Sequence, residues 1–221
     1  MSSRPGNRRR GSQRQVRHAG GRPGLVIGVT GSVAMGKSTA AILLKFLGVP
    51  VFNADATVHG LMGPKGKAVN AVAARFPGAT GALGVDRKAL GAKVFADTKA
   101  LTDLEAIIHP LVRAERERFL RQMALRRQPV VALDIPLLFE GNNENLCDLV
   151  IVISAPAFLQ RQRALARPAM TPGRLAGILA RQWPDARKRA CADAVVPSGI
   201  GKRETLRRLT QLLTLHRLHR R

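Results

Sequence analysis

The chain has 221 residues and a formal net charge of +23, and 45% of its residues are hydrophobic. This length and apolar content suit one α/β domain with a buried core, and they exclude a chain that is disordered throughout. No apolar run approaches about 18 residues, so we expect no membrane span. Aromatic residues make up 4% of the chain and tyrosine is missing, which argues against a platform that stacks single-stranded nucleic acid.

Residues 1–24 predict a disordered basic tail. They hold seven arginines and no acidic residue, together with many glycines and serines. Such a segment cannot bury enough apolar surface to fold by itself. The charge attracts polyanions, and we expect any contact with nucleic acid to be nonspecific and to involve the basic ends of the chain.

The start of the chain and its cysteines indicate the compartment. The tail has no apolar stretch of the kind found in secretory signals. Cys147 and Cys191 are far apart in the sequence, and this pattern predicts buried free thiols in a reducing environment. We therefore expect a cytoplasmic protein.

Residues 25–48 contain the most informative motif. Leu25–Thr30 is an apolar run that predicts a buried strand, and Thr39–Leu47 has helical spacing that stops at Gly48. The residues between them read GSVAMGKS and fit the G-x-x-x-x-G-K-[ST] phosphate-binding loop at every fixed position. In such a loop backbone N–H groups surround a polyphosphate, Lys37 reaches the β- and γ-phosphates, and the Ser38 hydroxyl can bind Mg²⁺.

Four more apolar runs follow, and each predicts a strand. They are continuous rather than alternating, as expected for a parallel sheet that is covered on both faces. We therefore predict an α/β fold over residues 25–221, with a doubly wound parallel sheet of the P-loop NTPase type and a site at the C-terminal ends of the strands. The runs are Val49–Phe52, Pro129–Asp134, Leu149–Ile153 and Ala194–Val196.

Two helical excursions interrupt the strands. Residues 60–127 are too long for a simple crossover and predict a helical substrate-binding insertion, in which one helix ends before Pro110 and a second runs to Arg127. Residues 157–190 are rich in arginine, and Pro168 and Pro172 break the helical pattern, so we expect a mobile lid. Leucines at helical spacing predict a terminal helix from Arg203 onward.

Carboxylates and arginines stand at the places where phosphoryl transfer needs them. Asp55 follows the second predicted strand and can orient an attacking hydroxyl, although it also suits a helix N-cap. Asp134 ends another strand and can reach Mg²⁺ directly or through water, or act as a salt-bridge partner. Arg163 and Arg167 lie one helical turn apart, so we expect them to share one helix face, which can close over a phosphate or stay solvated.

Together these segments resemble the dephospho-CoA kinase family from about Leu25 to Leu213. The resemblance is carried by the phosphate loop, the run from Asp134 to Glu140, the His109–Pro110 pair, and the spacing of Gln160, Arg163 and Arg167. It implies a P-loop kinase core with a helical CoA-binding region and a lid. It also implies phosphorylation of the ribose 3′-hydroxyl of dephospho-CoA by ATP, with these two small molecules as the partners.

The resemblance also implies a set of site residues. Asp55, Lys37 and Arg163 would be catalytic, and Ser38 and Asp134 would hold Mg²⁺. Asp55 would contact the acceptor together with two residues of the insertion, Arg87 and His109. The ATP-binding residues would be Gly31, Ser32, Val33, Ala34, Met35, Gly36, Lys37, Ser38, Thr39 and Arg167.

Two departures from the family pattern concern the site. The family usually has Asp-Ala-Asp where this chain has Asn53-Ala54-Asp55. The loop interior, Ser32 to Met35, replaces the usual glycine-rich sequence, and it is expected to place the bulk of Met35 near the phosphates. Another P-loop nucleotide kinase, or a basic nucleic-acid-binding P-loop NTPase, remains an alternative to a dephospho-CoA kinase.

Overall fold

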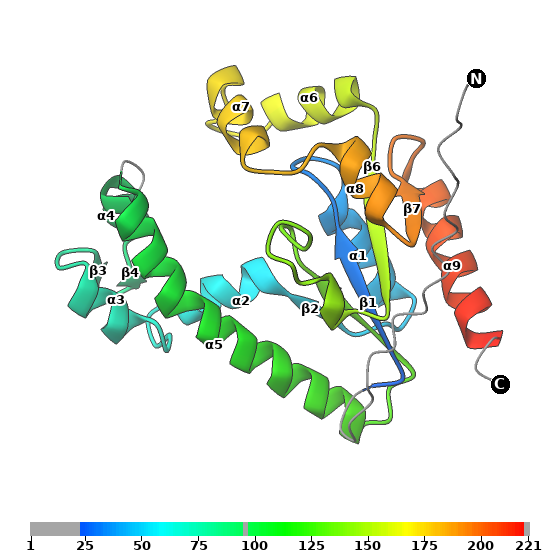
Figure 1. The fold of residues 1–221 in the computed structure, drawn as a ribbon, viewed down its shortest axis with the longest axis horizontal. Coiled ribbons are helices and arrows are strands. Elements are labelled where there is room, and N and C mark those ends of the chain that lie inside the picture. The colour runs from blue at the N-terminus through cyan, green and yellow to red at the C-terminus, as the bar shows by residue number, and fades with distance from the viewer. Residues whose placement is uncertain (1–22, 95–96, 219–221) are drawn as a thin grey trace, which may run out of the picture.

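The computed structural model describes residues 23–94 and 97–218, and nearly all of the predicted basic tail lies outside this range. The core is a five-stranded parallel sheet with the order β2-β5-β1-β6-β7 (Figure 1). This arrangement confirms the predicted α/β fold. The strands are β1 (Leu25–Thr30), β2 (Val51–Asn53), β5 (Val130–Asp134), β6 (Leu149–Ser154) and β7 (Ala194–Pro197).

Helices cover both faces of the sheet. On one face, alternate residues of β1 such as Ile27 pack with α1 (Lys37–Phe46) and α9 (Lys202–Leu218). On the other face, Val26 packs with the C-terminal part of α5 (Thr98–Leu125) and with the segment that leads into α8 (Asp185–Cys191). This double cover explains why the strands form continuous apolar runs up to their C-terminal ends.

The strand register brings polar residues to one edge of the sheet. Asp134, the last residue of β5, pairs with Val29 of β1 and with Asn53, the last residue of β2. The phosphate loop starts directly after β1, so the loop, Asn53 and Asp134 lie together. Parallel pairing therefore places the candidate site at the C-terminal edge of the sheet.

The insertion after β2 has an apolar core of its own. It consists of several short elements together with the N-terminal half of α5, and Figure 1 shows α3, α4, β3 and β4 gathered at the end of α5 that is remote from the sheet. Leu61, Val72, Phe76 and Leu90 are buried in this core. The short elements are α2 (Ala54–Leu61), α3 (Val69–Arg75), β3 (Thr80–Gly81), β4 (Gly84–Val85) and α4 (Arg87–Val94).

The prediction that a helix ends before Pro110 is wrong, because α5 continues through this residue. An internal proline removes one backbone hydrogen bond and usually costs about 3 kcal/mol. Packing on both sides of Pro110 offsets this cost. Ile108 is buried in the core of the insertion, and Leu120 and Met123 are buried against the sheet. One continuous helix therefore connects the two cores.

The arginine-rich excursion contains α6 (Ala157–Leu165), α7 (Pro172–Ala180) and α8. The side chain of Thr171 caps α7 by accepting from the N–H of Arg174, and Pro172 occupies the first turn. Figure 1 shows α6 and α7 beyond the C-terminal edge of the sheet, whereas α8 lies against β6. The three helices thus differ in what they contact.

A buried ion pair holds α8 in place. Lys188 is fully buried, and its Nζ lies 2.9 Å from Oε1 of Glu140. The same oxygen accepts a hydrogen bond from the N–H of Trp183 at 2.7 Å. The Trp183 ring stacks on the Phe139 ring, and the guanidinium of Arg187 lies over the Trp183 ring, 3.4 Å from its centroid. The pair therefore links α8 to the loop after β5.

Loss of this pair is expected to destabilise the fold. The Lys188→Ala variant leaves Glu140 as an uncompensated buried charge, so the free energy of unfolding should fall by about 3 kcal/mol in urea denaturation. Adding Glu140→Gln removes the charge but keeps an acceptor for Trp183, and it should recover part of the loss. A Lys188→Ala variant as stable as the parent would contradict this role.

The two cysteines differ in exposure. Cys147 is buried as predicted, but Cys191 is exposed at the end of α8, so the prediction of two buried thiols is wrong for Cys191. Neither cysteine forms a disulfide. Within the described residues, no helix has the length and apolar character needed to span a membrane.

Candidate active site

A cleft of about 710 Å³ opens at the C-terminal edge of the sheet. Its walls come from the phosphate loop, the first turn of α2, the α6–α7 region and the start of α9. Every predicted ATP-binding residue from Gly31 to Thr39 lines it, as do Asp55, Arg163 and Arg167. The fold therefore brings together residues that are more than 100 positions apart in the sequence.

Backbone geometry explains both fixed glycines of the loop. A Cβ on Gly31 would lie 2.5 Å from the carbonyl oxygen of Ile153, which no side chain tolerates. Gly36 has a φ of +90°, a conformation that glycine adopts without steric cost. Ala34 also has a positive φ, +61°, although it carries a Cβ. The loop is thus compact and carries local strain at Ala34.

Met35 lies differently from its expected position. Its side chain is 2% exposed, and its sulfur accepts a hydrogen bond from the N–H of Ala155 at 3.1 Å. The bulk of Met35 is therefore packed against the end of β6, which corrects the expectation that it crowds the phosphates.

Lys37, Asp134 and Asn53 form a polar group beside the loop. Lys37 Nζ lies 2.5 Å from Oδ1 of the fully buried Asp134, and Asn53 Nδ2 donates to Oδ2 at 2.7 Å. Burial raises the pKa of Asp134 above the usual value of an aspartate, while the Lys37 ammonium and the Asn53 amide oppose this rise. The salt-bridge alternative for Asp134 is therefore seen in the structure.

Asn53, and not Asp55, is the N-cap of α2. The side chain of Asn53 caps α2 by accepting from the N–H of Ala56 at 2.7 Å. Asp55 is exposed in the cleft, and among the described residues it makes no hydrogen bond or ion pair. The alternative that Asp55 caps the helix is thus wrong, and its carboxylate is available to another molecule.

Arg163 and Arg167 both line the cleft but do not share a helix face. The prediction that they do is wrong, because α6 ends at Leu165. Arg163 donates from one guanidinium nitrogen to the Ser198 carbonyl at 2.9 Å and from another to its hydroxyl at 3.2 Å. That hydroxyl donates to the Met35 carbonyl at 2.6 Å. Arg163 therefore ties α6 to the loop after β7 and, through Ser198, to the phosphate loop.

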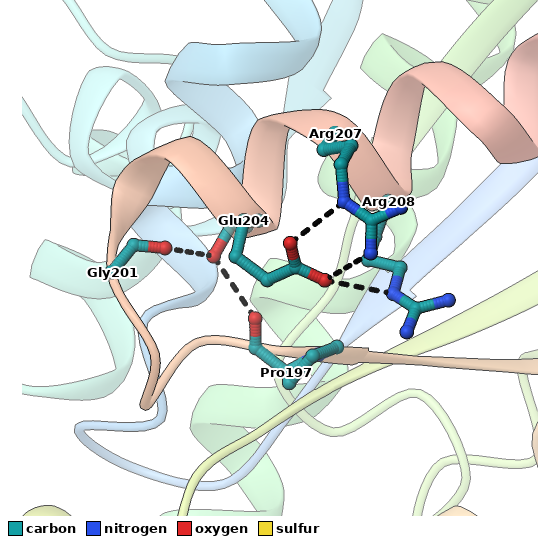
Figure 2. A network of polar contacts seen from close by, with 6 residues as sticks. Pro197, Gly201, Glu204, Arg207 and Arg208 are labelled. Carbon is teal, nitrogen blue, oxygen red and sulfur yellow. Dashed lines mark hydrogen bonds and ion pairs between the residues drawn. The ribbon is translucent and has the colours of Figure 1, made fainter.

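The first turn of α9 forms another wall. Thr205 lines the cleft, and its hydroxyl lies 3.0 Å from the carbonyl oxygen of Pro197 and 3.1 Å from that of Gly201. Figure 2 shows the carboxylate of Glu204, which accepts hydrogen bonds from both Arg207 and Arg208. Hydrogen bonds from Arg207, and next from Arg208, lower the pKa of Glu204 to about 2. This group orders the exposed side of the turn.

The predicted acceptor residues of the insertion lie outside the cleft. Arg87, at the start of α4, contacts His59 of α2, with Nη1 and Nε2 2.6 Å apart. His109 is exposed on α5 and does not join them. Sequence reasoning missed His59, although it follows Asp55 by one helical turn in α2 and could have been found from that spacing.

Metal ligands are sparse among the described residues, since no group of three or more His, Cys, Asp or Glu side chains is close enough to hold an ion. The Ser38 hydroxyl is exposed in the cleft. Both Asp134 oxygens already accept hydrogen bonds, from Lys37 and Asn53.

Known proteins resemble this chain in sequence and in fold. The sequence profile of the dephospho-CoA kinase family matches residues 25–201. A dephospho-CoA kinase from Rhodospirillum rubrum is 57% identical over 195 residues, which cover 87% of this chain and 92% of that protein. The crystal structure of TT1252 from Thermus thermophilus has a TM-score of 0.78 and 31% identity, covering 88% of this chain and 98% of that one. A dephospho-CoA kinase from Campylobacter jejuni shares the fold, with a TM-score of 0.59 and 24% identity over 86% of this chain and 95% of that one. This chain therefore belongs to the dephospho-CoA kinase family.

Proposed function

We propose that the protein transfers the γ-phosphoryl group of ATP to the ribose 3′-hydroxyl of dephospho-CoA, yielding coenzyme A and ADP. Family membership supports ATP-dependent phosphorylation of this substrate. The observation that carries the proposal in the structure is one cleft that unites a complete phosphate loop with the uncommitted carboxylate of Asp55. A phosphoryl group held at the loop thus faces a group that can accept a hydroxyl proton.

A substrate comparison tests the reaction. ADP release from the full chain is measured with dephospho-CoA, with nucleoside monophosphates and with DNA, and coenzyme A is identified by mass spectrometry. Of these three additions, we expect only dephospho-CoA to support ADP release from ATP together with formation of coenzyme A. Preferred phosphorylation of a nucleoside monophosphate would favour another P-loop nucleotide kinase, and DNA-stimulated ATP hydrolysis without coenzyme A would favour a nucleic-acid-binding NTPase.

We propose that the residues present suit a hydrated Mg²⁺ bound with ATP. Mg²⁺ keeps several waters and is commonly held by one or two protein oxygens together with phosphates. Ser38 offers an exposed hydroxyl for direct contact, and Asp134 would act through water because its oxygens are engaged by Lys37 and Asn53. When bound, the ion would neutralise charge on the β- and γ-phosphates.

The remaining side chains receive roles from their positions. We propose that Lys37 stabilises charge on the transferring phosphoryl group and that Asp55 orients the 3′-hydroxyl and accepts its proton. Arg87, supported by His59, and His109 are exposed on the insertion and are proposed to bind the acceptor. Arg163 and Arg167 are proposed to face the ATP phosphates from the α6–α7 side of the cleft.

Arg163→Lys is expected to lower kcat by about tenfold, or about 1.4 kcal/mol of barrier. The reason is geometric, because lysine keeps the charge but cannot donate to both Ser198 oxygens from one planar group. Arg174→Lys is the matched control, since Arg174 bonds the Ala169 carbonyl and does not line the cleft. Equal small effects of both changes in steady-state kinetics would show that the planar contacts of Arg163 do not contribute to catalysis.

Two wider properties follow as proposals. Two cysteines without a disulfide, one of them exposed, suit a reducing cytoplasm. The excess of basic residues suits only nonspecific, salt-sensitive binding of nucleic acid. Removing residues 1–22 should weaken such binding and leave the kinase reaction unchanged.

A further inference from the structure

The apex of the phosphate loop is held from two sides. The N–H of Val33 donates to Oε1 of Gln182 at 2.9 Å. The carbonyl oxygen of the same residue accepts from Nε2 of Gln160 at 3.0 Å. Gln160 lies on α6 and Gln182 lies two residues after the end of α7. The two glutamines therefore bind both backbone polar groups of Val33, one from each end of the α6–α7 segment (residues 157–182).

An apolar contact joins the same two parts. Ala34 is buried together with Ala164 of α6 and Leu175 of α7, and the partly buried Val33, Leu165 and Met170 pack around them. Ala34 has a positive φ of +61°, a backbone conformation that strains a residue with a Cβ. A glycine-rich interior would avoid this strain but would offer no side chain to α6 and α7. The side chains of Val33 and Ala34 thus give α6 and α7 an apolar surface to pack against.

The chemistry of the two amides is set by the backbone. A backbone N–H can only donate, so Gln182 must present its oxygen to Val33. A backbone carbonyl can only accept, so Gln160 must present its nitrogen. Neither amide can be turned without losing its bond to the loop. Gln160 is also buried, with 9% of its surface exposed, so no solvent would readily replace it.

We propose that Gln160 and Gln182 are positioning residues that set the phosphate loop for ATP through Val33. They occupy both polar backbone groups of Val33, which fixes the two peptide planes that flank this residue at the apex of the loop. Donors that are already oriented cost little reorganisation when a charged ligand binds. The inference rests on the ATP site proposed above, and it makes the α6–α7 segment part of that site before any ligand arrives.

Neutral substitutions of similar length test the proposal. Gln160→Met and Gln182→Met each leave one backbone group of Val33 without its partner, and we expect the dissociation constant of a non-hydrolysable ATP analogue to rise about tenfold. The KM for dephospho-CoA should stay within about twofold. Gln162→Met is the matched control, because Gln162 is exposed on the same helix, and it should bind the analogue like the parent.

Hydrogen exchange gives a readout that needs no turnover. In the ligand-free protein, the amides of residues 31–36 should exchange faster in Gln160→Met and Gln182→Met than in Gln162→Met. If Gln160→Met does not fold, Gln160→Asn replaces it, because the shorter amide stays polar but cannot reach Val33. The proposal would be overturned if Gln160→Met and Gln182→Met both bound the ATP analogue, and exchanged the amides of residues 31–36, as the parent does. A parent that binds the analogue but does not phosphorylate dephospho-CoA would instead overturn the proposed function alone.

Discussion

The Lys37→Ala variant is expected to lose about 10³-fold or more in kcat while remaining folded. Lys37 is the cation carried by the phosphate loop itself, and phosphoryl transfer depends mainly on positioning and charge stabilisation. Its ammonium already lies in the cleft against Asp134. Steady-state kinetics with ATP and dephospho-CoA measure the effect.

Stability and catalysis must be separated in this variant, because Lys37→Ala leaves the buried Asp134 with only the Asn53 amide as a partner. Adding Asp134→Asn removes the uncompensated charge, so thermal denaturation should return toward the parent while activity should not. A folded Lys37→Ala protein with turnover near that of the parent would refute the assignment of the phosphate loop.

Asp55→Asn is expected to lower kcat by roughly 10²–10⁴-fold with little change in ATP binding. The substitution keeps the size of the side chain but removes the proton acceptor. It should leave the fold intact, because Asn53 and not Asp55 caps α2, and Asp55 makes no hydrogen bond or ion pair among the described residues. The measurements are steady-state kinetics and equilibrium binding of an ATP analogue.

A matched control isolates the local role of this carboxylate. Glu105→Gln also removes one exposed negative charge, but from α5 and outside the cleft, and it should leave kcat within about twofold. If Asp55→Asn and Glu105→Gln behave alike, Asp55 does not act on the acceptor hydroxyl.

Local sequence patterns were sufficient for the parts of the protein that depend on nearby residues. Apolar runs identified β1, β5 and β6 because strands that are buried on both faces are apolar on both sides, here up to their polar last residues. The spacing of Gly31, Gly36 and Lys37 identified the phosphate loop because these residue types stand at fixed intervals in such loops. The ends of β2 and β5 indicated Asp55 and Asp134 as candidates.

Tertiary contacts decided what local patterns could not. Pro110 predicts a helix end, but burial of Ile108 on one side and Leu120 on the other keeps α5 continuous. The distance between Arg163 and Arg167 along the chain indicated a shared face, but α6 ends first and Arg163 turns to Ser198, 35 residues away. For α5, packing against two distant cores outweighs the local cost of the proline, about 3 kcal/mol.

The sequence by itself determined the family, the α/β fold class, the strands of the main sheet and the phosphate loop, since these depend on short-range spacing and continuous apolar runs. Only the tertiary structure decided which polar groups meet. Asn53 caps α2 and holds Asp134, and Gln160 and Gln182 hold Val33 across 127 and 149 residues. Such pairs leave no periodic signal, because a hydrogen bond depends on distance in space and on the orientation of donor and acceptor.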